Sequence, residues 1–521
     1  MWVHAHTVDP DERRTTVSTS GGNDTPRESA ASTPARPGGV AASDTATQWA
    51  ALGALCLGFF MILVDSTIVS VANPAIMREL GADIESVVWV TSAYLLAYAV
   101  PLLITGRLGD RFGQRRVYLA GLVLFTVASL CCGLASNIGT LIVARVFQGF
   151  GAALMSPQTM AVITRIFPAD RRGSAMGVWG AVAGVATLVG PLAGGVLVDG
   201  LGWEWIFFVN VPVGVIGFVL AAKFVPALPV HSHRFDVPGV VISALGMFLL
   251  VFGIQEGNGY DWSAGVWAMI GAGMVLLVLF VWYQSWGRGE PLVPLRLFRD
   301  RNFSLANVGI AAIGFAITAV MLPLMFYAQN VRGLSPTGAA LLMVPMAVLS
   351  GVLAPFVGRL VDVLHPRYIA GTGFALLAVA FAWLALVMTP DSATWELLLP
   401  IALTGVASAG IWAPLSATAT HNLDQELAGA GSGVYNTTRQ VGAVLGSAAV
   451  GALMAGLLSS HGLDENVANG PAGLPEAARE PYSAAMSGSM WLPAAVLVVG
   501  FVVSVLFARP RAQVERRVAT G

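Results

Sequence analysis

Charged residues are scarce in this sequence of 521 residues, where they make up only 11% of the chain. Soluble globular proteins carry about 25% charged residues. Hydrophobic residues account for 56% of the chain, and 59 glycines add to its apolar share. Because a soluble fold cannot hide so much apolar surface, the sequence predicts an integral membrane protein. The formal net charge of −1 gives no basis for a nucleic-acid partner.

Cysteine and lysine are also rare. The three cysteines, Cys56, Cys131 and Cys132, all fall within apolar runs, so we expect neither a disulfide framework nor a metal site. Lys223 is the single lysine, and the phosphate-binding pattern Gly-x4-Gly-Lys-Ser/Thr does not occur, so direct use of ATP is not expected. No group of His, Asp and Ser lines up at one depth either. We therefore expect no enzyme activity and no bound cofactor.

Long apolar runs are abundant instead, and they are continuous rather than alternating, which indicates helices rather than a membrane barrel. Each has about 20 residues, enough to cross a hydrocarbon core of about 30 Å. The fourteen runs lie near 50–73, 86–106, 117–135, 139–163, 174–198, 205–226, 237–255, 264–284, 304–328, 337–358, 369–388, 395–419, 431–457 and 489–508. The predicted fold class is an all-α integral membrane protein with 14 transmembrane helices.

The distribution of positive charge sets the expected orientation. With the N-terminus inside, most loop arginines fall in inner loops, and only Arg78, Arg332 and Arg479 fall in outer loops. An even number of spans then places both termini in the cytoplasm of a bacterial cell, with the protein in its plasma membrane. Residues 1–48 are polar and rich in Ser, Thr, Gly and Pro, so they predict a disordered cytoplasmic tail, unless they reflect an over-long gene start. Residues 509–521 are expected to form a second cytoplasmic tail.

An internal repeat divides the chain. The segment Gly106–Arg116 follows the second run, and a similar segment that includes Asp362 follows the tenth run, 252 residues later. Duplicated halves are the usual construction of secondary transporters. Because the repeat offset of 252 residues is longer than a segment of six spans, the additional residues predict two inserted helices. The predicted domains are a six-helix bundle at 49–228, a linker with two inserted helices at 229–300, and a second six-helix bundle at 301–508 with an extracellular loop at 458–488.

Five motifs occur in order at these runs. They are Val64-Asp-Ser-Thr-Ile-Val-Ser-Val-Ala-Asn-Pro74, Gly106-Arg-Leu-Gly-Asp-Arg-Phe-Gly-Gln-Arg-Arg116, Arg145-Val-Phe-Gln-Gly-Phe-Gly151, Gly190-Pro-Leu-Ala-Gly-Gly195 and Trp203-Glu-Trp-Ile-Phe-Phe-Val-Asn-Val-Pro212. With them, residues 50–508 resemble the major facilitator superfamily, and within it the drug–proton antiporters with fourteen spans. The chain departs from that family's pattern at Ser70, Asn73 and Glu204.

The resemblance implies two pseudo-symmetric six-helix bundles that rock about a midplane site, with two further helices inserted between them. It also implies multidrug efflux, in which lipophilic, cationic or zwitterionic compounds leave the cell in exchange for protons. The proton motive force would then be the energy source, with no cofactor. The expected partners are small lipophilic substrates, protons and the lipid bilayer, and we expect a monomer.

Asp65 and Arg145 are expected at similar depth, about 10–12 Å below the outer surface. A carboxylate at that depth costs at least about 2.5–3.5 kcal/mol, which favours a role in taking up and releasing a proton. The other interpretation is a structural carboxylate at a helix bend. We predict that Asp65 and Arg145 interact directly, or through water or Gln148, so that protonation changes their attraction. A static ion pair, or an arginine bonded to backbone carbonyls, is the alternative.

The corresponding positions of the second half, Ile317 and about Ile401, are apolar. Proton chemistry is therefore expected in the first half, and the second half is expected to contribute more of the substrate wall. The exception is a polar group in span thirteen that predicts either a gate or plain structural bonding. This gate group consists of Asn436, Arg439 and Gln440.

The segment after span two combines a carboxylate, several guanidinium groups and glycines. We expect it to form a tight turn between two helices and to act as a conformational latch, mostly because of the resemblance. The alternative is a basic loop that only sets topology. The latch group consists of Gly106, Gly109, Asp110, Arg111, Gly113, Arg115 and Arg116, with Asp362 as its counterpart in the second half.

Span five carries small residues and a proline on one face, which allow close helix packing and a bend. By resemblance this is the antiporter motif, a hinge that limits proton leak. Generic tight packing is the alternative. The hinge group consists of Gly184, Gly190, Pro191, Gly194 and Gly195.

Two alternatives to proton-coupled drug export remain open at this point. One is export of an endogenous metabolite, antibiotic or lipid. The other is a membrane sensor or scaffold that uses the same fold without transport.

Overall fold

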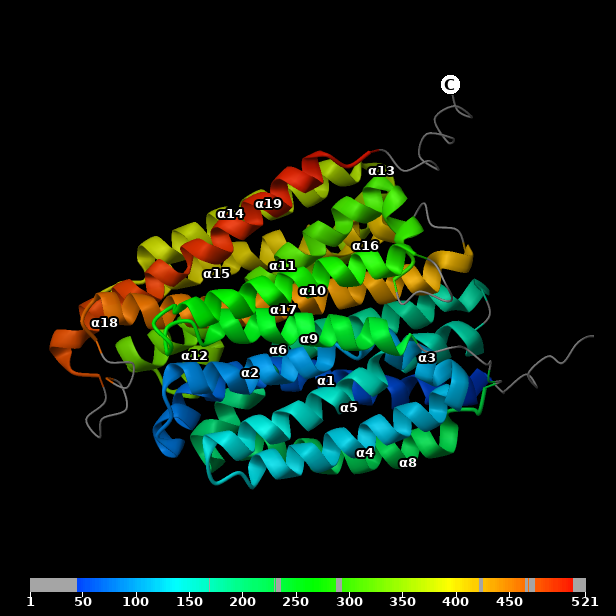
Figure 1. Cartoon of the computed structure of the whole chain (residues 1–521), viewed down its shortest axis with the longest axis horizontal. Coiled ribbons are helices and arrows are strands. Elements are labelled where there is room, and N and C mark those ends of the chain that lie inside the picture. The colour runs from blue at the N-terminus through cyan, green and yellow to red at the C-terminus, as the bar shows by residue number, and fades with distance from the viewer. Residues whose placement is uncertain are drawn as a thin grey trace, which may run out of the picture. The chain divides into compact units, whose positions relative to one another are not determined.

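The computed structural model describes residues 45–508, apart from 168, 229, 231–235, 287–292, 421–424, 464–466 and 468–473. Most of the predicted tail at 1–48 and the whole predicted tail at 509–521 therefore lie outside the described residues. The described residues belong to one compact unit. All regular structure within them is helical, so the all-α prediction is confirmed there (Figure 1).

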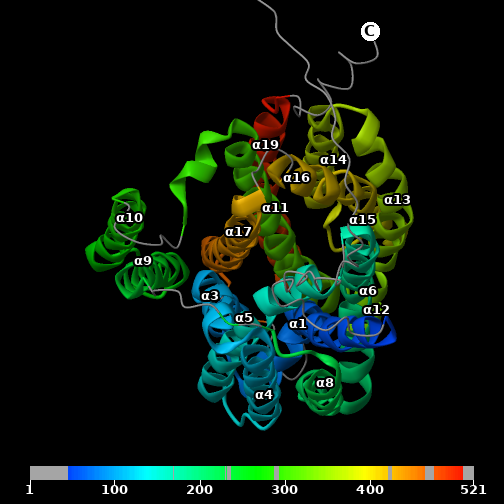
Figure 2. The same cartoon turned by 90° about the vertical axis from the view of Figure 1, so that its right-hand side faces the viewer.

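The first half of the chain forms eight helical segments. They are α1 (Thr45–Leu80), α2 (Ile84–Ala99), α3 (Leu102–Phe112), α4 (Gln114–Gly133), α5 (Ile138–Ile166), α6 (Ala169–Leu201), α7 (Trp205–Phe208) and α8 (Asn210–Phe224). The inserted pair follows as α9 (Val237–Gln255) and α10 (Ala264–Ser285), which pack against each other (Figure 2).

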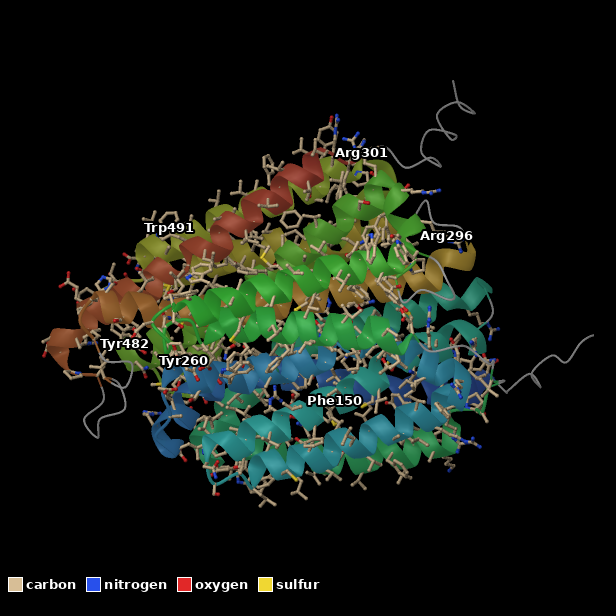
Figure 3. All side chains as sticks on the ribbon, viewed as in Figure 1. Phe150, Tyr260, Arg296, Arg301, Tyr482 and Trp491 are labelled. Carbon is tan, nitrogen blue, oxygen red and sulfur yellow. The ribbon has the colours of Figure 1, made fainter. Side chains whose placement is uncertain are left out.

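The second half contains the remaining helices. They are η1 (Leu295–Arg299), α11 (Arg301–Phe326), η2 (Tyr327–Val331), α12 (Pro336–Leu341), α13 (Val344–Val363), α14 (Pro366–Val387), α15 (Thr394–Ala409), α16 (Trp412–Thr420), α17 (Gln425–Ser460), α18 (Glu476–Ser489) and α19 (Trp491–Val505). Among these, η1 is a 3-10 helix and η2 is a π-helix that continues α11. Figure 3 shows Arg296 and Arg301 at one end of the helices and Tyr260 and Tyr482 at the other.

Twelve candidate spans among the described residues are long and apolar enough to cross a membrane. A bent pair, Ile84–Ala99 with Ile104–Phe112, raises the count to thirteen if it is one span. The predicted run 174–198 lies in α6, of which Val189–Leu201 is a shorter apolar helix. The chain is thus a multi-pass membrane protein, and the count of fourteen stays a prediction.

The structure adds detail to two local predictions. The run 86–106 was expected to be one span, and its two helical segments, Ile84–Ala99 and Ile104–Phe112, meet at a bend of 52°. Pro101 lies at the break, where its ring clashes with the preceding turn and it has no N–H to donate. The outer loop 458–488 contains a 14-residue helix, α18, which buries Tyr482 and Met486 on one face. The other face of α18 is polar, so the segment Glu476–Ser489 shows no continuous apolar run.

Each half is held together by close helix packing. In the first half α1 packs on α6 and α8, and α5 packs on α2 and α4. In the second half α11 packs on α17 and α19, and α14 packs on α15 and α19. Glycines allow these approaches: a Cβ on Gly446 of α17 would lie 2.3 Å from the Phe315 carbonyl oxygen of α11. No larger residue fits there without moving a backbone.

The two halves meet along several pairs of helices, among them α2 with α17, α6 with α12, and α1 with α11. Ser92 donates to the Ser447 hydroxyl at 2.9 Å, and the Gln329 side chain donates to the Val71 carbonyl at 2.9 Å. The loop after α9 touches both halves at one of these seams. Its residue Asn258 donates to the Ala452 carbonyl of α17, and the neighbouring Glu256 accepts from the Trp89 indole of α2.

Candidate functional site

Asp65 of α1 lies in the interior of the first half and is 0% exposed. It stands in a long apolar helix, and its neighbours Val64 and Ile68 are buried core residues. An unpaired carboxylate would be costly in such surroundings, so its stability depends on the polar groups that α5 and α8 bring to it.

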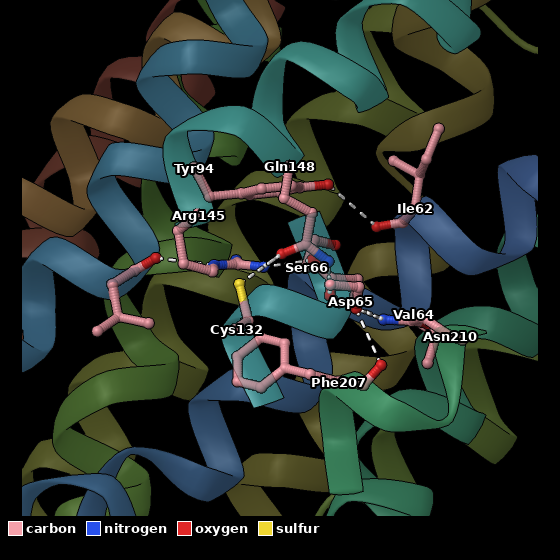
Figure 4. Close-up of polar contacts among 12 residues, drawn as sticks. Ile62, Val64, Asp65, Ser66, Tyr94, Cys132, Arg145, Gln148, Phe207 and Asn210 are labelled. Atoms are coloured by element: carbon pink, nitrogen blue, oxygen red, sulfur yellow. Dashed lines mark hydrogen bonds and ion pairs between the residues drawn. The ribbon is translucent and has the colours of Figure 1, made fainter. Parts of the chain in front are cut away.

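Arg145 of α5 makes the principal contact with Asp65. Its Nη1 donates to Asp65 Oδ2 at 2.5 Å, and the arginine is 1% exposed (Figure 4). Its Nε donates to the Val90 carbonyl of α2 at 3.0 Å. The guanidinium also lies 4.0 Å from the centre of the Tyr94 ring and 5.7 Å from that of Phe207, within range of cation–π attraction. The arginine is thus fixed on three sides.

Gln148 and Asn210 complete the coordination of the carboxylate. Gln148 Nε2 donates to Asp65 Oδ1 at 2.8 Å, and Gln148 Oε1 accepts from Arg145 at 2.7 Å. Asn210 Nδ2, at the start of α8, donates to the same Asp65 Oδ1 at 3.2 Å and to Ser129 at 3.0 Å. Both carboxylate oxygens therefore have donors. We call Asp65, Arg145, Gln148 and Asn210 the charged cluster.

The charged cluster supplies hydrogen-bond donors to both oxygens of Asp65. Buried ion pairs persist when further hydrogen bonds satisfy their remaining polar atoms, as Gln148 and Asn210 do here. Protonation of Asp65 would remove its attraction to Arg145 and leave the guanidinium with Gln148, the Val90 carbonyl and the tyrosine ring. Asp65 has no exposed surface in this state.

Sequence analysis placed three of these side chains at a common site and missed the others. Asp65, Arg145 and Gln148 lie in direct contact. Asn210 was part of a motif but had no assigned role, although an amide within an apolar run was a usable signal. Ser129, which donates to the Phe207 carbonyl, and Cys132, whose Sγ lies 3.6 Å from Gln148 Oε1, were not predicted either.

The tight turn predicted between two helices in the latch group is confined to Gly113, between α3 and α4. Residues Leu102–Phe112 form the helix α3, so Gly106, Gly109 and Asp110 are helical. Only Gly113, with φ of +94°, occupies a turn conformation that favours glycine. Gly109 is needed for close packing instead, because a Cβ there would lie 1.8 Å from the Gln158 side chain of α5.

Asp110 bridges the end of α3 to two neighbours. It accepts from Arg165 of α5 at 2.8 Å and from Gln114 of α4 at 2.8 Å. The side chains of the ion pair are 34% and 29% exposed, so the pair itself contributes at most about 1 kcal/mol. Arg115 donates to the Ala222 carbonyl of α8. These contacts lie within the first half, and the Asp362 side chain lies outside the described residues.

We expect the two glycines of the latch group to respond differently to alanine. Gly109→Ala displaces the buried Gln158 amide, which donates to the Thr105 carbonyl, and should lower the free energy of unfolding by about 1–3 kcal/mol. Gly106→Ala places its Cβ 3.9 Å from Pro157, an ordinary contact, and should leave stability unchanged or slightly raised. Thermal unfolding of the purified variants measures both. Equal destabilisation would contradict the packing described here.

The hinge group forms close contacts along α6. A Cβ on Gly190 would lie 1.9 Å from Thr67 Oγ1, and one on Gly194 would lie 2.8 Å from the Ile68 side chain, so these glycines let α6 approach α1. Gly195 faces the other half, where a Cβ would lie 2.6 Å from the Thr337 Cα. Pro191 lies inside α6, as does Gly184.

Asp199, in the last turn of α6, links the two halves near Gly195. Its Oδ2 accepts from the Thr337 backbone N–H at 2.9 Å, at the start of α12. Partial burial alone raises the pKa of Asp199, but hydrogen bonds from Thr337 and Ser335 outweigh it and lower the pKa below the ordinary 3.8. Asp199 lies beyond the predicted run 174–198, and sequence analysis gave it no role.

The Asp199 contact should be insensitive to external pH in the physiological range. Because the pKa is lowered in the joined state, the contact is fully formed above pH 3.8 and is lost only as pH falls through the lowered value. Spin labels at Val196 and Leu341, both exposed, in a Cys131→Ala and Asp65→Asn background, where residue 65 cannot bind a proton, should report the same α6–α12 distance from pH 8 to pH 5. A separation that grows between pH 7 and pH 5 would contradict this assignment.

The gate group lies on α17, near the seam with α2. Gln440 is 4% exposed, and Arg439 and Asn436 are half-buried. The Arg439 carbonyl oxygen would lie 2.4 Å from a Cβ on Gly314, which brings α17 close to α11. The charge of Arg439 also acts on Tyr98 of α2, so the arginine lies near the seam with the first half.

Many apolar membrane helices in two packed halves, with a charged cluster buried in one of them, define a multi-pass membrane transporter rather than an enzyme. Known proteins agree: a family model described as Major Facilitator Superfamily matches residues 55–447. The chain belongs to this superfamily.

Among its relatives is an uncharacterized MFS-type transporter of Mycobacterium tuberculosis, 57% identical over 87% of this chain and 80% of the relative. The tetracenomycin C resistance and export protein of Streptomyces glaucescens is 35% identical over 78% of this chain and 76% of the relative. The fold is similar to a bacterial homolog of the human lysosomal transporter Spinster in an inward-facing, occupied crystal structure. That structure shares 18% identity, with a TM-score of 0.62 over 90% of this chain and 98% of the other.

Proposed function

We propose that the protein is a proton-coupled multidrug exporter of the fourteen-span antiporter type, which moves lipophilic compounds out of the cell by alternating access. The observation that carries the proposal is the charged cluster, a fully buried carboxylate paired with a fully buried arginine in the first half. A proton on Asp65 would release Arg145, and loss of that proton would restore the pair. Such a two-state element is what coupling a proton to a conformational change requires.

The contacts between the halves supply the second part of the proposal. Asp199–Thr337, Gln329–Val71 and Ser92–Ser447 join helices at or toward the ends that sequence analysis predicts to be outer. We take this state as closed to the outside. The proton motive force would drive the change to the outward-open state, and no cofactor is needed.

Fewer observations bear on which compound is exported. The resemblance implies lipophilic, cationic or zwitterionic compounds, and a cation among them would need a carboxylate such as Asp65. In this state Asp65 already accepts from Arg145, Gln148 and Asn210, so a cation would reach it only after rearrangement. The second candidate, export of a particular natural product, is favoured by the relative named for tetracenomycin C resistance and export.

Liposomes that contain the purified protein test the proposal. An imposed pH gradient should drive uptake or release of a lipophilic fluorescent dye, and nigericin, which collapses the gradient, should stop it. Export that persists in nigericin would contradict proton coupling. Dye movement no faster than in empty liposomes, across a panel of neutral, anionic and cationic dyes, would favour the sensor or scaffold alternative.

A further inference from the structure

The predicted spans contain three deeply placed charges, Asp65, Arg145 and Arg439. The first two neutralise each other across 2.5 Å. Arg439 therefore adds one positive charge with no carboxylate to balance it. A guanidinium stays protonated in proteins, and a cation inside a membrane costs at least about 2.5–3.5 kcal/mol unless it faces water or a partner.

Arg439 has no such partner in the part of the chain that the structure describes, where its side chain makes no hydrogen bond or ion pair. It is half-buried rather than enclosed, so part of its side chain remains accessible. This differs from Arg145, whose guanidinium is bonded to Asp65, Gln148 and the Val90 carbonyl. Arg145 is thus hydrogen-bonded by the protein on several sides, whereas the Arg439 side chain makes no such bond within the described residues.

The groups around Arg439 suit an acidic aromatic ligand. Tyr435, one turn earlier on α17, is 9% exposed, and its hydroxyl has no partner among the described residues. Tyr98 of α2 lies close enough for the charge of Arg439 to act on its hydroxyl, as it also does on Tyr435. A guanidinium one helical turn from a hydroxyl that lacks a partner among the described residues offers donors to a carboxylate or phenolate, and the two buried tyrosine rings give it aromatic surroundings.

We propose that Arg439, with Tyr435, binds an anionic group of the exported compound, so that lipophilic acids rather than lipophilic cations are the preferred substrates. This inference rests on the proposed export function. It assigns the two arginines separate tasks: Arg145 serves the proton cycle in the first half, and Arg439 serves substrate recognition in the second. An acidic substrate would neutralise the charge that the spans leave unbalanced.

Two xanthene dyes of opposite charge make the test specific. Fluorescein is an anion and rhodamine 123 is a cation at pH 7.5, and both can be followed in phosphatidylcholine liposomes under an imposed pH gradient. The wild type should transport fluorescein faster than rhodamine 123. Arg439→Gln should lower fluorescein transport at least about tenfold, which corresponds to loss of one charge-assisted contact, and leave rhodamine 123 unchanged. Arg439→Lys should retain part of the fluorescein transport.

A second variant distinguishes loss of substrate binding from misfolding. Tyr435→Phe keeps the ring and removes only the free hydroxyl, and it should weaken fluorescein binding several-fold, measured by fluorescence polarisation on the purified protein. Equal loss of both dyes in Arg439→Gln would show a conformational lock and overturn the inference, as would unchanged fluorescein transport. An Arg439→Gln effect that appears only when phosphatidylglycerol is added would assign the arginine to lipid headgroups and also overturn it. Wild-type liposomes that move neither dye would contradict the export function itself.

Discussion

Asp65→Asn should reduce transport driven by a pH gradient to the level of empty liposomes. Asparagine has nearly the shape of aspartate and keeps an oxygen that can accept from Arg145, but it cannot take up or release a proton. The buried arginine also loses its counter-charge. Breaking a buried pair costs about 3–5 kcal/mol, and the remaining hydrogen bonds should keep the loss of folding free energy below that range. Dye transport and thermal unfolding of the same preparation measure the two effects.

Two matched variants control this experiment. Asp65→Glu retains a titratable carboxylate and should keep part of the gradient-driven transport, although the longer side chain disturbs the bonds from Gln148 and Asn210. Asp199→Asn removes a carboxylate outside the charged cluster and should leave proton coupling intact. If Asp65→Asn transports as well as the wild type under the gradient, the role proposed for Asp65 is wrong.

Gly195→Ala should shift the protein toward the state that is open to the outside. The added Cβ would lie 2.6 Å from the Thr337 Cα and 2.9 Å from the Pro336 carbonyl oxygen, so two backbones must separate. Overpacking of this kind costs about 1–3 kcal/mol, which is roughly a 5–150-fold change in the ratio of the two states. The distance between spin labels at Val196 and Leu341 should lengthen, and transport should fall with it.

Gly200→Ala is the matched control for this prediction. Gly200 lies on the same helix, five residues later, but a Cβ there would meet nothing within 4 Å. We expect its label distances and transport to equal those of the wild type. An unchanged distance in Gly195→Ala would mean that α6 and α12 do not form the outer closure.

The membrane architecture could be predicted because its signal is repeated along the whole chain. Continuous apolar runs of about 20 residues have few structural solutions other than membrane helices. The features that hydropathy does not show are local. The bend at Pro101 lies inside an apolar run, so hydropathy alone does not show it, and α18 has a polar face that resembles a loop.

The candidate site was predicted in part, because some of its residues are charged and others are not. Asp65 and Arg145 stood out because charged side chains are costly at that depth and therefore need each other. Asn210 and Ser129 are uncharged and cost less at that depth, and their roles depend on the packing of α8 against α1 and α4. Asp199 could not be recognised from the sequence either, because its role depends on the hydrogen bond that it accepts from Thr337 of the other half.

The most direct test of the account is proton release from the purified, detergent-solubilised protein when a transported dye is added, followed with a pH indicator in weakly buffered solution. If Asp65 exchanges its proton for substrate, wild-type protein should release protons on dye addition, and Asp65→Asn should release none while still binding the dye. Equal proton release from both proteins, or none from a wild type that binds the dye, would contradict proton exchange at Asp65.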